Sequence, residues 1–355
     1  MTGSNGSAAA EPAKPAPGSP AGAAANRPRV PDPGPPPIAT ELLARLRARV
    51  SETVVGYADV VRMLAIALVT QGHVLLEGTP GIAKTLLVRT FADSLALGFK
   101  RIQFTPDMLP SDIVGAVVLN PVNRELEYRP GPVFSNVVLA DEINRAPPKV
   151  QSALLEAMQE RQVTVDGVGH PLPNPFIVIA TQNPIEQEGT YPLPEAELDR
   201  LLFRLLMGYP SADEERALNR LYATPFVPPA APALVDPPLL ERLRADVGAV
   251  NLSDEVLAYT VALVRATRAD KRILIGASPR AGVQLTRAAK AQAMFSGRAY
   301  VTPDDVKAVA FWVLNHRVTL RPELVAQYYT EGALGSEPAL RTVLQDLFDR
   351  VPAPR

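Results

Sequence analysis

Five short segments in the middle of the chain are mostly apolar: residues 74–77, 101–104, 137–141, 176–181 and 203–207. Polar residues do not alternate with apolar ones in them, so we expect strands covered on both faces, as in a parallel sheet. Residues 85–96 and 148–161 have helical spacing, with Val150, Leu154 and Met158 on one apolar face. This alternation predicts an α/β fold, with a five-stranded parallel sheet between helices.

Two segments interrupt that alternation. Residues 115–130 carry apolar runs on either side of residues 120–123, and residues 162–172 contain the turn-forming pair Asp166-Gly167. Both are predicted to be β-hairpin inserts that project from the sheet domain.

After Tyr209 the pattern is helical only, beginning with a short helix near residues 212–222 and continuing after a proline-rich connector. Ser278-Pro279 and Thr302-Pro303 each place a hydroxyl N-cap before a proline at the first helical position. We therefore predict an α/β domain over residues 38–223, a linker over 224–236 and a smaller, all-helical lid domain over 237–355.

Residues 1–37 contain 10 Pro, 9 Ala and 5 Gly and almost no large apolar side chain. Such a segment cannot offset the entropy of ordering its backbone, and we expect a disordered tail. It has no apolar core of a secretory signal. Apolar runs such as residues 63–69 are too short to span a membrane, so no membrane span and a cytoplasmic location are expected.

The net charge and the cysteine content exclude several classes of ligand and of catalytic site. Lys and Arg number 36 against 37 Asp and Glu, a net charge of −1 that gives no general field for binding polyanions. The absence of cysteine excludes disulfides, thiolate metal sites and thiol nucleophiles. The chain has three histidines, which lie far apart in sequence, and this disfavours a histidine metal site or a histidine-based catalytic triad.

A phosphate-binding loop follows the first strand, with the sequence GTPGIAKT at residues 78–85. Gly78 and Gly81 allow close backbone approach to phosphates, Lys84 would reach the β and γ phosphates, and the Thr85 hydroxyl would bind Mg²⁺. Ala83 stands where the standard motif has glycine, and alanine is acceptable there if the residue is already helical. The expected nucleotide-binding residues in this loop are Gly78, Thr79, Pro80, Gly81, Ile82, Ala83, Lys84, Thr85 and Leu86.

Polar residues end two of the later strands. Asp141 and Glu142 follow an apolar strand, where ligands sit in open α/β sheets. Asp141 is predicted to hold Mg²⁺, and Glu142 to polarise the water that attacks the γ-phosphorus. Asn183, one strand later, could hydrogen-bond both that water and a phosphate oxygen, although an Asn-Pro pair also simply begins turns.

These motifs together resemble the MoxR family of AAA+ ATPases, from about residue 38 to residue 350. The segments that carry the resemblance are GTPGIAKT (78–85), RIQFTPDMLPSD (101–112), ADEINRA (140–146), ATQNP (180–184) and GASPR (276–280). Ala83 also matches the usual form of the loop in this family.

The resemblance implies further roles. Asn183 would be the sensor of the γ-phosphate. Arg200 would be an arginine finger that reaches the neighbouring subunit's nucleotide, with Arg204 as the alternative. Arg280 would be a second sensor that contacts the γ-phosphate from the same subunit. Val55 and Gly56 would pack on adenine, although Tyr57 replaces the glutamine often seen after that glycine.

At the level of the whole protein, the resemblance implies ATP and Mg²⁺ as cofactors and a ring of identical subunits, a hexamer. Such a ring would remodel or mature protein complexes, acting on a protein client beside a partner with a von Willebrand factor A domain. The hairpin inserts would line the pore, with their loops at residues 120–124 and 166–170 touching the client.

Three alternatives remain open at this stage. A nucleic-acid motor is disfavoured by the near-neutral charge and by inserts whose positive residues are only Arg124, Arg129 and Arg161, so no nucleic-acid partner is expected. A chelatase-type ATPase subunit for metal insertion is close to the main interpretation. A non-hydrolysing, nucleotide-gated binding module conflicts with the presence of Asp141, Glu142 and Arg200.

Overall fold

The computed structural model describes residues 37–184, 189–224, 231–330 and 337–354. The predicted tail, apart from Pro37, and residues 225–230 of the predicted linker lie outside the described residues. Among the helices that are described, none combines the length and apolar character needed to cross a bilayer.

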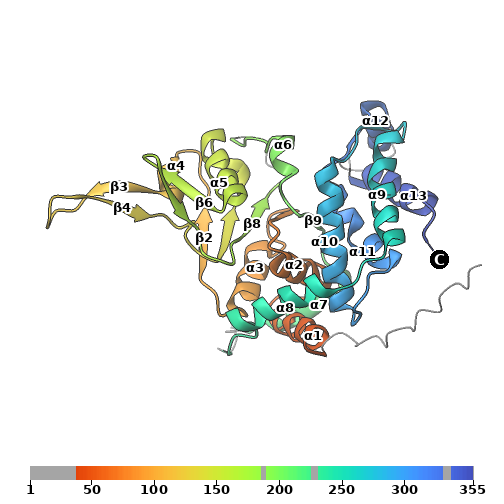
Figure 1. Ribbon diagram of the computed structural model, residues 1–355, viewed down its shortest axis with the longest axis horizontal. Helices are drawn as coiled ribbons and strands as arrows, with labels where there is room; N and C mark the ends of the chain where they lie inside the picture. The colour runs from red at the N-terminus through yellow and green to blue at the C-terminus, as the bar shows by residue number, and fades with distance from the viewer. Residues whose placement is uncertain (1–36, 185–188, 225–230, 331–336, 355) are drawn as a thin grey trace, which may run out of the picture. The chain divides into compact units, whose positions relative to one another are not determined.

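A five-stranded parallel sheet forms the centre of the α/β part (Figure 1). In spatial order its strands are β2 (Phe99–Gln103), β5 (Val137–Asp141), β8 (Ile177–Gln182), β1 (Val74–Gly78) and β9 (Phe203–Met207). All five strands and their parallel arrangement agree with the prediction. Because β1 lies between β8 and β9, the loop that follows it emerges among the ends of neighbouring strands, where open α/β sheets bind ligands.

Each face of the sheet has its own hydrophobic core. Val74 and Leu76 of β1 belong to one cluster and Leu75 to the other, because successive strand residues point to opposite faces. The first cluster includes α1 (Pro37–Ser51), α2 (Ala58–Thr70) and α3 (Lys84–Asp93), and the second includes α4 (Pro110–Val114) and α5 (Pro148–Glu160). The edge strand β2 differs from the expectation of full burial, since only Ile102 of its five residues is buried.

Both predicted hairpins are present and they touch each other. β3 (Gly115–Leu119) pairs with β4 (Leu126–Pro130), and β6 (Gln162–Val165) pairs with β7 (Val168–Pro171), both antiparallel. Tyr128 of β4 stacks on His170 of β7, with ring centroids 4.1 Å apart. The free end of the β3–β4 hairpin extends beyond the rest of the α/β part (Figure 1).

Helices dominate the chain after β9. They are α7 (Ala212–Tyr222), α8 (Pro237–Ala249), α9 (Asp254–Ala269), α10 (Pro279–Phe295), α11 (Pro303–Leu314), α12 (Pro322–Thr330) and α13 (Glu337–Arg350). The lid is not purely helical, in contrast to the prediction, because β10 (Ile273–Ile275) and β11 (Thr319–Leu320) form a small antiparallel sheet. Strands of three and two residues are too short to produce a periodic signal in the sequence.

A buried ion pair joins the lid to the α/β part. The Nε of Arg317, whose side chain is 1% exposed, lies 2.9 Å from Oδ1 of Asp199. Burial lowers the pKa of Arg317 to about 10, and the charge of Asp199 opposes that change, so the guanidinium is charged at neutral pH. Removing one member of such a pair leaves an uncompensated buried charge.

Ser278 takes part in the same junction rather than capping a helix. Its hydroxyl makes no cap hydrogen bond and instead donates to Asp199 at 3.0 Å, which corrects the prediction of a hydroxyl N-cap at this position. Thr302 does cap α11, since its hydroxyl accepts a hydrogen bond from the backbone of Asp305. The two Ser/Thr-Pro pairs therefore have different functions.

His73, the residue before β1, is fully buried and held at both ring nitrogens. Nδ1 accepts a hydrogen bond from the Val178 backbone at 2.9 Å, and Nε2 lies 3.1 Å from the Met158 carbonyl. Burial lowers the pKa of His73 to about 4 from its ordinary value of 6.5. Between these two values the unfolded chain binds a proton that the folded chain does not.

We predict that His73 makes the free energy of unfolding fall as the pH drops below 6.5, by about 3 kcal/mol once the pH reaches 4. In His73→Asn, which keeps an acceptor for Val178, the loss between pH 7 and pH 5 should be smaller than in the wild type. Urea unfolding at both pH values measures it, with His170→Asn as the control. Equal losses in wild type and His73→Asn would contradict the assignment.

Candidate functional site

The loop between β1 and α3 is shaped by two glycines. A Cβ on Gly78 would lie 2.4 Å from Cδ1 of Ile82 and 2.6 Å from the carbonyl oxygen of Met207, so no side chain fits there. Gly81 has a φ of +85°, in the left-handed region that glycine adopts without strain. Both were predicted from the motif, and the structure shows two different reasons for them.

Ala83 does not meet the condition under which alanine was acceptable at this position. It is not helical: it is the N-cap of α3, with a φ of +67°, and the helix begins at Lys84. A left-handed conformation is unusual for alanine and marks a strained position in the loop. The Nζ of Lys84 donates to the carbonyls of Gly78 and of Thr79, the latter at 2.9 Å, so the lysine lies against the concave side of the loop.

The predicted Mg²⁺ ligands are in direct contact. The Thr85 hydroxyl donates to Oδ2 of Asp141 at 2.9 Å, and Asp141 is 4% exposed. A hydroxyl and a carboxylate are oxygen donors of the kind that Mg²⁺ takes in phosphate sites, with phosphate oxygens and water completing the shell. In the described part of the chain no group of three or more His, Asp or Glu residues could hold a metal.

Glu142 is held in place by its neighbours. Its φ is +59°, again left-handed and strained, and Nε2 of Gln103 donates to its Oε2 at 2.8 Å. The Nε of Arg145 lies 3.1 Å from the same oxygen. Strain of this type is common where a side chain must point in one direction for function.

Thr181 contacts both acidic residues, the carboxylate of Asp141 and the backbone of Glu142, and was not singled out from the sequence. Its hydroxyl donates to Oδ1 of Asp141 at 2.6 Å and accepts from the backbone N–H of Glu142 at 2.9 Å. Arg101 was also missed, and its guanidinium lies 2.8 Å from Oδ2 of Asp141. Both contacts depend on the alignment of β2 and β8 with β5, which residue spacing does not show.

A hollow of about 390 Å³ joins these groups, and residues Pro80, Gly81, Ala83, Lys84, Thr85, Leu86, Asp141, Glu142, Thr181, Gln182 and Asn183 line it. Asn183, predicted to sense the γ-phosphate, is 5% exposed and lies in this hollow with the carboxylates. The structure therefore brings the loop, the carboxylate pair and the predicted sensor together.

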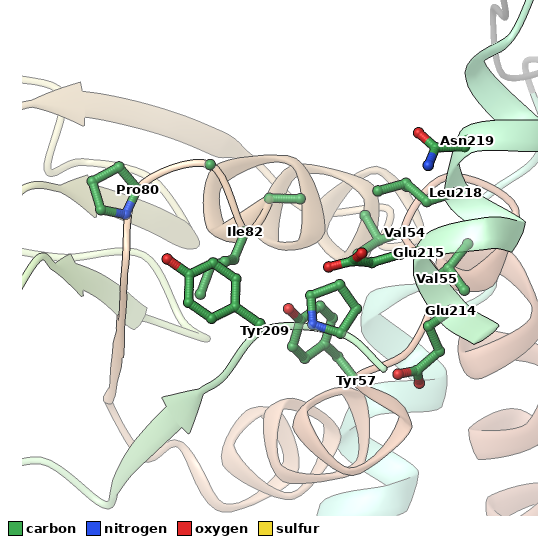
Figure 2. Close-up of a pocket in the computed structure, with 13 residues that line it drawn as sticks. Val54, Val55, Tyr57, Pro80, Ile82, Tyr209, Glu214, Glu215, Leu218 and Asn219 are labelled. Atoms are coloured by element: carbon green, nitrogen blue, oxygen red, sulfur yellow. The ribbon is translucent and has the colours of Figure 1, made fainter. Parts of the chain in front are cut away.

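A second hollow of about 320 Å³ shares Pro80, Gly81 and Ala83 with the first. The other residues that line it are Val54, Val55, Tyr57, Ile82, Tyr209, Pro210, Glu214, Glu215, Leu218 and Asn219 (Figure 2). Val55, predicted to pack on adenine, lies here. Gly56 does not line the hollow, but its φ is +86° and a Cβ on it would lie 2.8 Å from Oε1 of Glu214.

The contribution of α7 and of Tyr209 to this second hollow was not predicted. Tyr57, noted as a departure from the family pattern, lines it too, and its hydroxyl donates to the Gly208 carbonyl at 2.8 Å. Two aromatic rings and the side chain of Leu218 suit a flat, partly apolar group such as a nucleobase. No local motif links residues this far apart in sequence.

The two predicted arginines lie elsewhere. Arg200 and Arg280 line a separate hollow of about 420 Å³ together with His73 and Arg287. His73 precedes β1, whereas the phosphate loop follows it, and five strand residues separate the two ends by about 16 Å. Arg280 therefore does not lie where it could contact a γ-phosphate in its own subunit, in contrast to the expectation.

Arg204, the alternative arginine finger, is engaged within its own subunit. Its Nε and Nη2 each lie 2.7 Å from an oxygen of Glu77, a bidentate pair across β9 and β1. Arg200 pairs with Glu197 at 2.6 Å near the surface. Both arginines are therefore paired within their own subunit, with side chains that are 30% exposed for Arg200 and 25% exposed for Arg204.

Comparison with known proteins agrees with this site. The family described as "ATPase family associated with various cellular activities (AAA)" matches residues 73–203, and the AAA lid domain family matches residues 265–333. The chain is 46% identical over 294 residues to the chaperone MoxR1 of Mycobacterium tuberculosis, a match that covers 80% of this chain and 77% of that protein. The chain belongs to the MoxR family of AAA+ ATPases.

Two further matches cover most of the chain. The protein YeaC of Bacillus subtilis, described as uncharacterized, is 47% identical over 282 residues, which cover 79% of this chain and 88% of YeaC. A solved structure from Cytophaga hutchinsonii, described as a candidate ATPase, superposes with a TM-score of 0.79 at 41% identity and covers 89% of this chain and 96% of its own. The AAA+ fold predicted from the sequence is thereby confirmed.

We predict that Thr181→Val lowers ATP turnover by about 10- to 100-fold, because the carboxylate of Asp141 and the backbone N–H of Glu142 both lose the hydroxyl that orients them. Nucleotide affinity should change little, since the loop and the second hollow are untouched. Phosphate release and nucleotide titration measure the two quantities. Thr164→Val, on the exposed side of the β6–β7 hairpin, serves as the control. Wild-type turnover in Thr181→Val would contradict this role.

Proposed function

We propose that the chain binds Mg·ATP across the two joined hollows and hydrolyses it. The supporting observation is the contact network in which Thr85, Asp141, Thr181 and Glu142 meet at the mouth of the phosphate loop. The second hollow would take the adenine base, and the shared residues Pro80, Gly81 and Ala83 would lie along the ribose and phosphates.

Each group in the phosphate hollow has one task in this reaction. The backbone N–H groups of the loop and the Nζ of Lys84 would hold the β and γ phosphates. Thr85 and Asp141 would hold Mg²⁺, which neutralises charge on the phosphates when bound. Glu142 would accept the proton of the attacking water, and the Asn183 amide would position that water against the γ-phosphate.

Charge stabilisation from a neighbouring subunit would complete the site. Arg200 and Arg280 lie at the amino end of β1, opposite the phosphate loop, so neither is placed to serve its own nucleotide. Closed homo-oligomers with head-to-tail contacts bring such opposite faces together. We therefore assign both arginines to the nucleotide of the next subunit in a ring, with six subunits as the expected number.

The work done by hydrolysis would be remodelling of a protein client. Leu119, Val122 and Leu126 at the free end of the β3–β4 hairpin are 60%, 92% and 73% exposed, an apolar tip suited to a protein rather than a nucleic acid. The name of the relative MoxR1, a chaperone, points in the same direction. A partner with a von Willebrand factor A domain is part of this proposal, on the basis of the family resemblance.

Mixing two inactive variants tests hydrolysis and the shared site together. Glu142→Gln should bind ATP without turnover, and the double variant Arg200→Ala/Arg280→Ala should lose about 10³-fold in turnover while keeping its own phosphate hollow intact. In a random 1:1 ring, about a quarter of the sites combine an intact carboxylate with intact arginines, and turnover should recover accordingly.

Arg265→Ala, an exposed arginine on α9, is the control for nonspecific charge loss and should keep wild-type turnover. Failure of the mixture to recover any activity, with both variants assembling normally, would mean that the arginines act within their own subunit or not at all. Turnover in Glu142→Gln alone would contradict the role of the carboxylate.

A further inference from the structure

A fourth hollow, of about 530 Å³, is lined by positive charge. It lies apart from the phosphate loop and shares Arg287 with the hollow that Arg200 and Arg280 line. The residues that line it are Val69, Thr70, Gln71, Arg161, Arg244, Val247, Gly248, Arg287 and Lys290. Four of these nine side chains are cationic and none is a carboxylate. They come from the end of α2, the end of α5, α8 and α10, so the hollow lies between the α/β part and the lid helices.

Carbonyl groups at helix C-termini stabilise only two of these four cations. Lys290 Nζ donates to the Gly248 carbonyl near the end of α8 at 2.8 Å, and Arg161 Nη2 donates to the Gln71 carbonyl at the end of α2 at 3.0 Å. Cations are stabilised by the partial negative charge at helix C-termini. This stabilisation is small at exposed sites, and it does not account for Arg244 and Arg287, which also line the hollow.

Arg244 is only partly satisfied by its neighbours. Its side chain is 10% exposed and its Nη1 pairs with Glu241 at 2.6 Å, but its Nε and Nη2 are buried and have no hydrogen-bond partner among the described residues. Buried guanidinium N–H groups are costly when they are unsatisfied. Arg287 likewise makes no hydrogen bond or ion pair within the described ranges.

The cations are close enough to repel one another. Burial lowers the pKa of Arg161, and the neighbouring charges of Arg244 and Arg287 lower it further. Like charges are gathered in this way where they face a bound anion, because the attraction of each cation to the anion outweighs the repulsion between the cations.

We propose that this hollow binds a small anion with two or more phosphate groups, at a site separate from the phosphate loop. Four cations in about 530 Å³ match a di- or triphosphate chain in charge and size better than a single phosphate. Lys290 and Arg161 contact the anion directly in this arrangement, and Arg287 of α10 contacts it as a further cation. An occupant would be held by α2, α5, α8 and α10 at once and would therefore fix the lid against the α/β part.

This site is independent of the proposed ATP hydrolysis, and its test is designed accordingly. Tripolyphosphate is titrated by calorimetry into the full chain carrying Lys84→Ala, which removes phosphate binding at the loop. We expect one equivalent bound per subunit, with an affinity that falls as salt is raised. In the same background, Arg161→Gln/Lys290→Gln should weaken binding by about 10- to 100-fold.

Arg242→Gln is the matched control, because Arg242 is an exposed cation on α8 that does not line the hollow. It should bind tripolyphosphate within about twofold of its parent, since a distant exposed charge is screened by salt. No binding in Lys84→Ala, or binding unaffected by Arg161→Gln/Lys290→Gln, would overturn the proposal. Binding that disappears when subunits assemble would also overturn it, since neighbouring copies would then fill the hollow.

A measurement on the unaltered chain covers the case in which the double variant does not fold. Amine acetylation followed by mass spectrometry should show Lys290 protected by tripolyphosphate, with Mg·ADP present throughout to occupy the phosphate loop. Lys307 on α11 should be modified equally with and without the anion. Equal modification of Lys290 under both conditions would contradict the site. Replacing tripolyphosphate with ATP or with pyrophosphate then shows whether the natural ligand is a nucleotide or an inorganic chain.

Discussion

The buried carboxylate of Asp141 is the constraint on which the rest of the site depends. It receives hydrogen bonds from Thr85 at the start of α3 and from Thr181 at the end of β8, and a guanidinium contact from Arg101 of β2. A carboxylate that is 4% exposed is tolerated only with this number of partners. These contacts tie the phosphate loop to three strands, so the loop geometry and the sheet register are fixed together.

The same parallel sheet separates the two halves of the proposed chemistry. The carboxylates and the phosphate loop lie at the carboxyl ends of the strands, and Arg200 and Arg280 lie at the amino end of β1. The pair between Asp199 and Arg317 holds the lid beside Arg200. In the proposed function one subunit would offer acceptors for water and metal on one face and cations on the other, and assembly would join them.

Local patterns were sufficient for the sheet, the hairpins and the phosphate loop. Apolar runs revealed β1, β5, β8 and β9, and the Asp166-Gly167 turn revealed one hairpin, because these signals reside in neighbouring residues. Thr181 and Tyr209 were missed because their roles arise from strand register and from a helix far along the chain. The position of Arg280 was wrong for the same reason: its place relative to the phosphate loop depends on how the lid packs, which no short motif encodes.

Local residue preferences did not predict the structure at positions where the same residue type can take two different roles. Ser278 before Pro279 has the sequence of an N-cap, yet its hydroxyl binds Asp199 in the junction with the α/β part. Alanine at position 83 suits a helical residue, whereas the loop has a left-handed residue at that point. In both cases a tertiary contact or the path of the loop outweighs local preference.

Turnover per subunit as a function of protein concentration, with molar mass followed by light scattering, tests the central claim most directly. If a nucleotide site needs arginines from a second copy, turnover per subunit should rise by about 10³-fold or more as the single chain assembles. A dilute monomer that hydrolyses ATP as fast per subunit as the assembled protein would contradict the account.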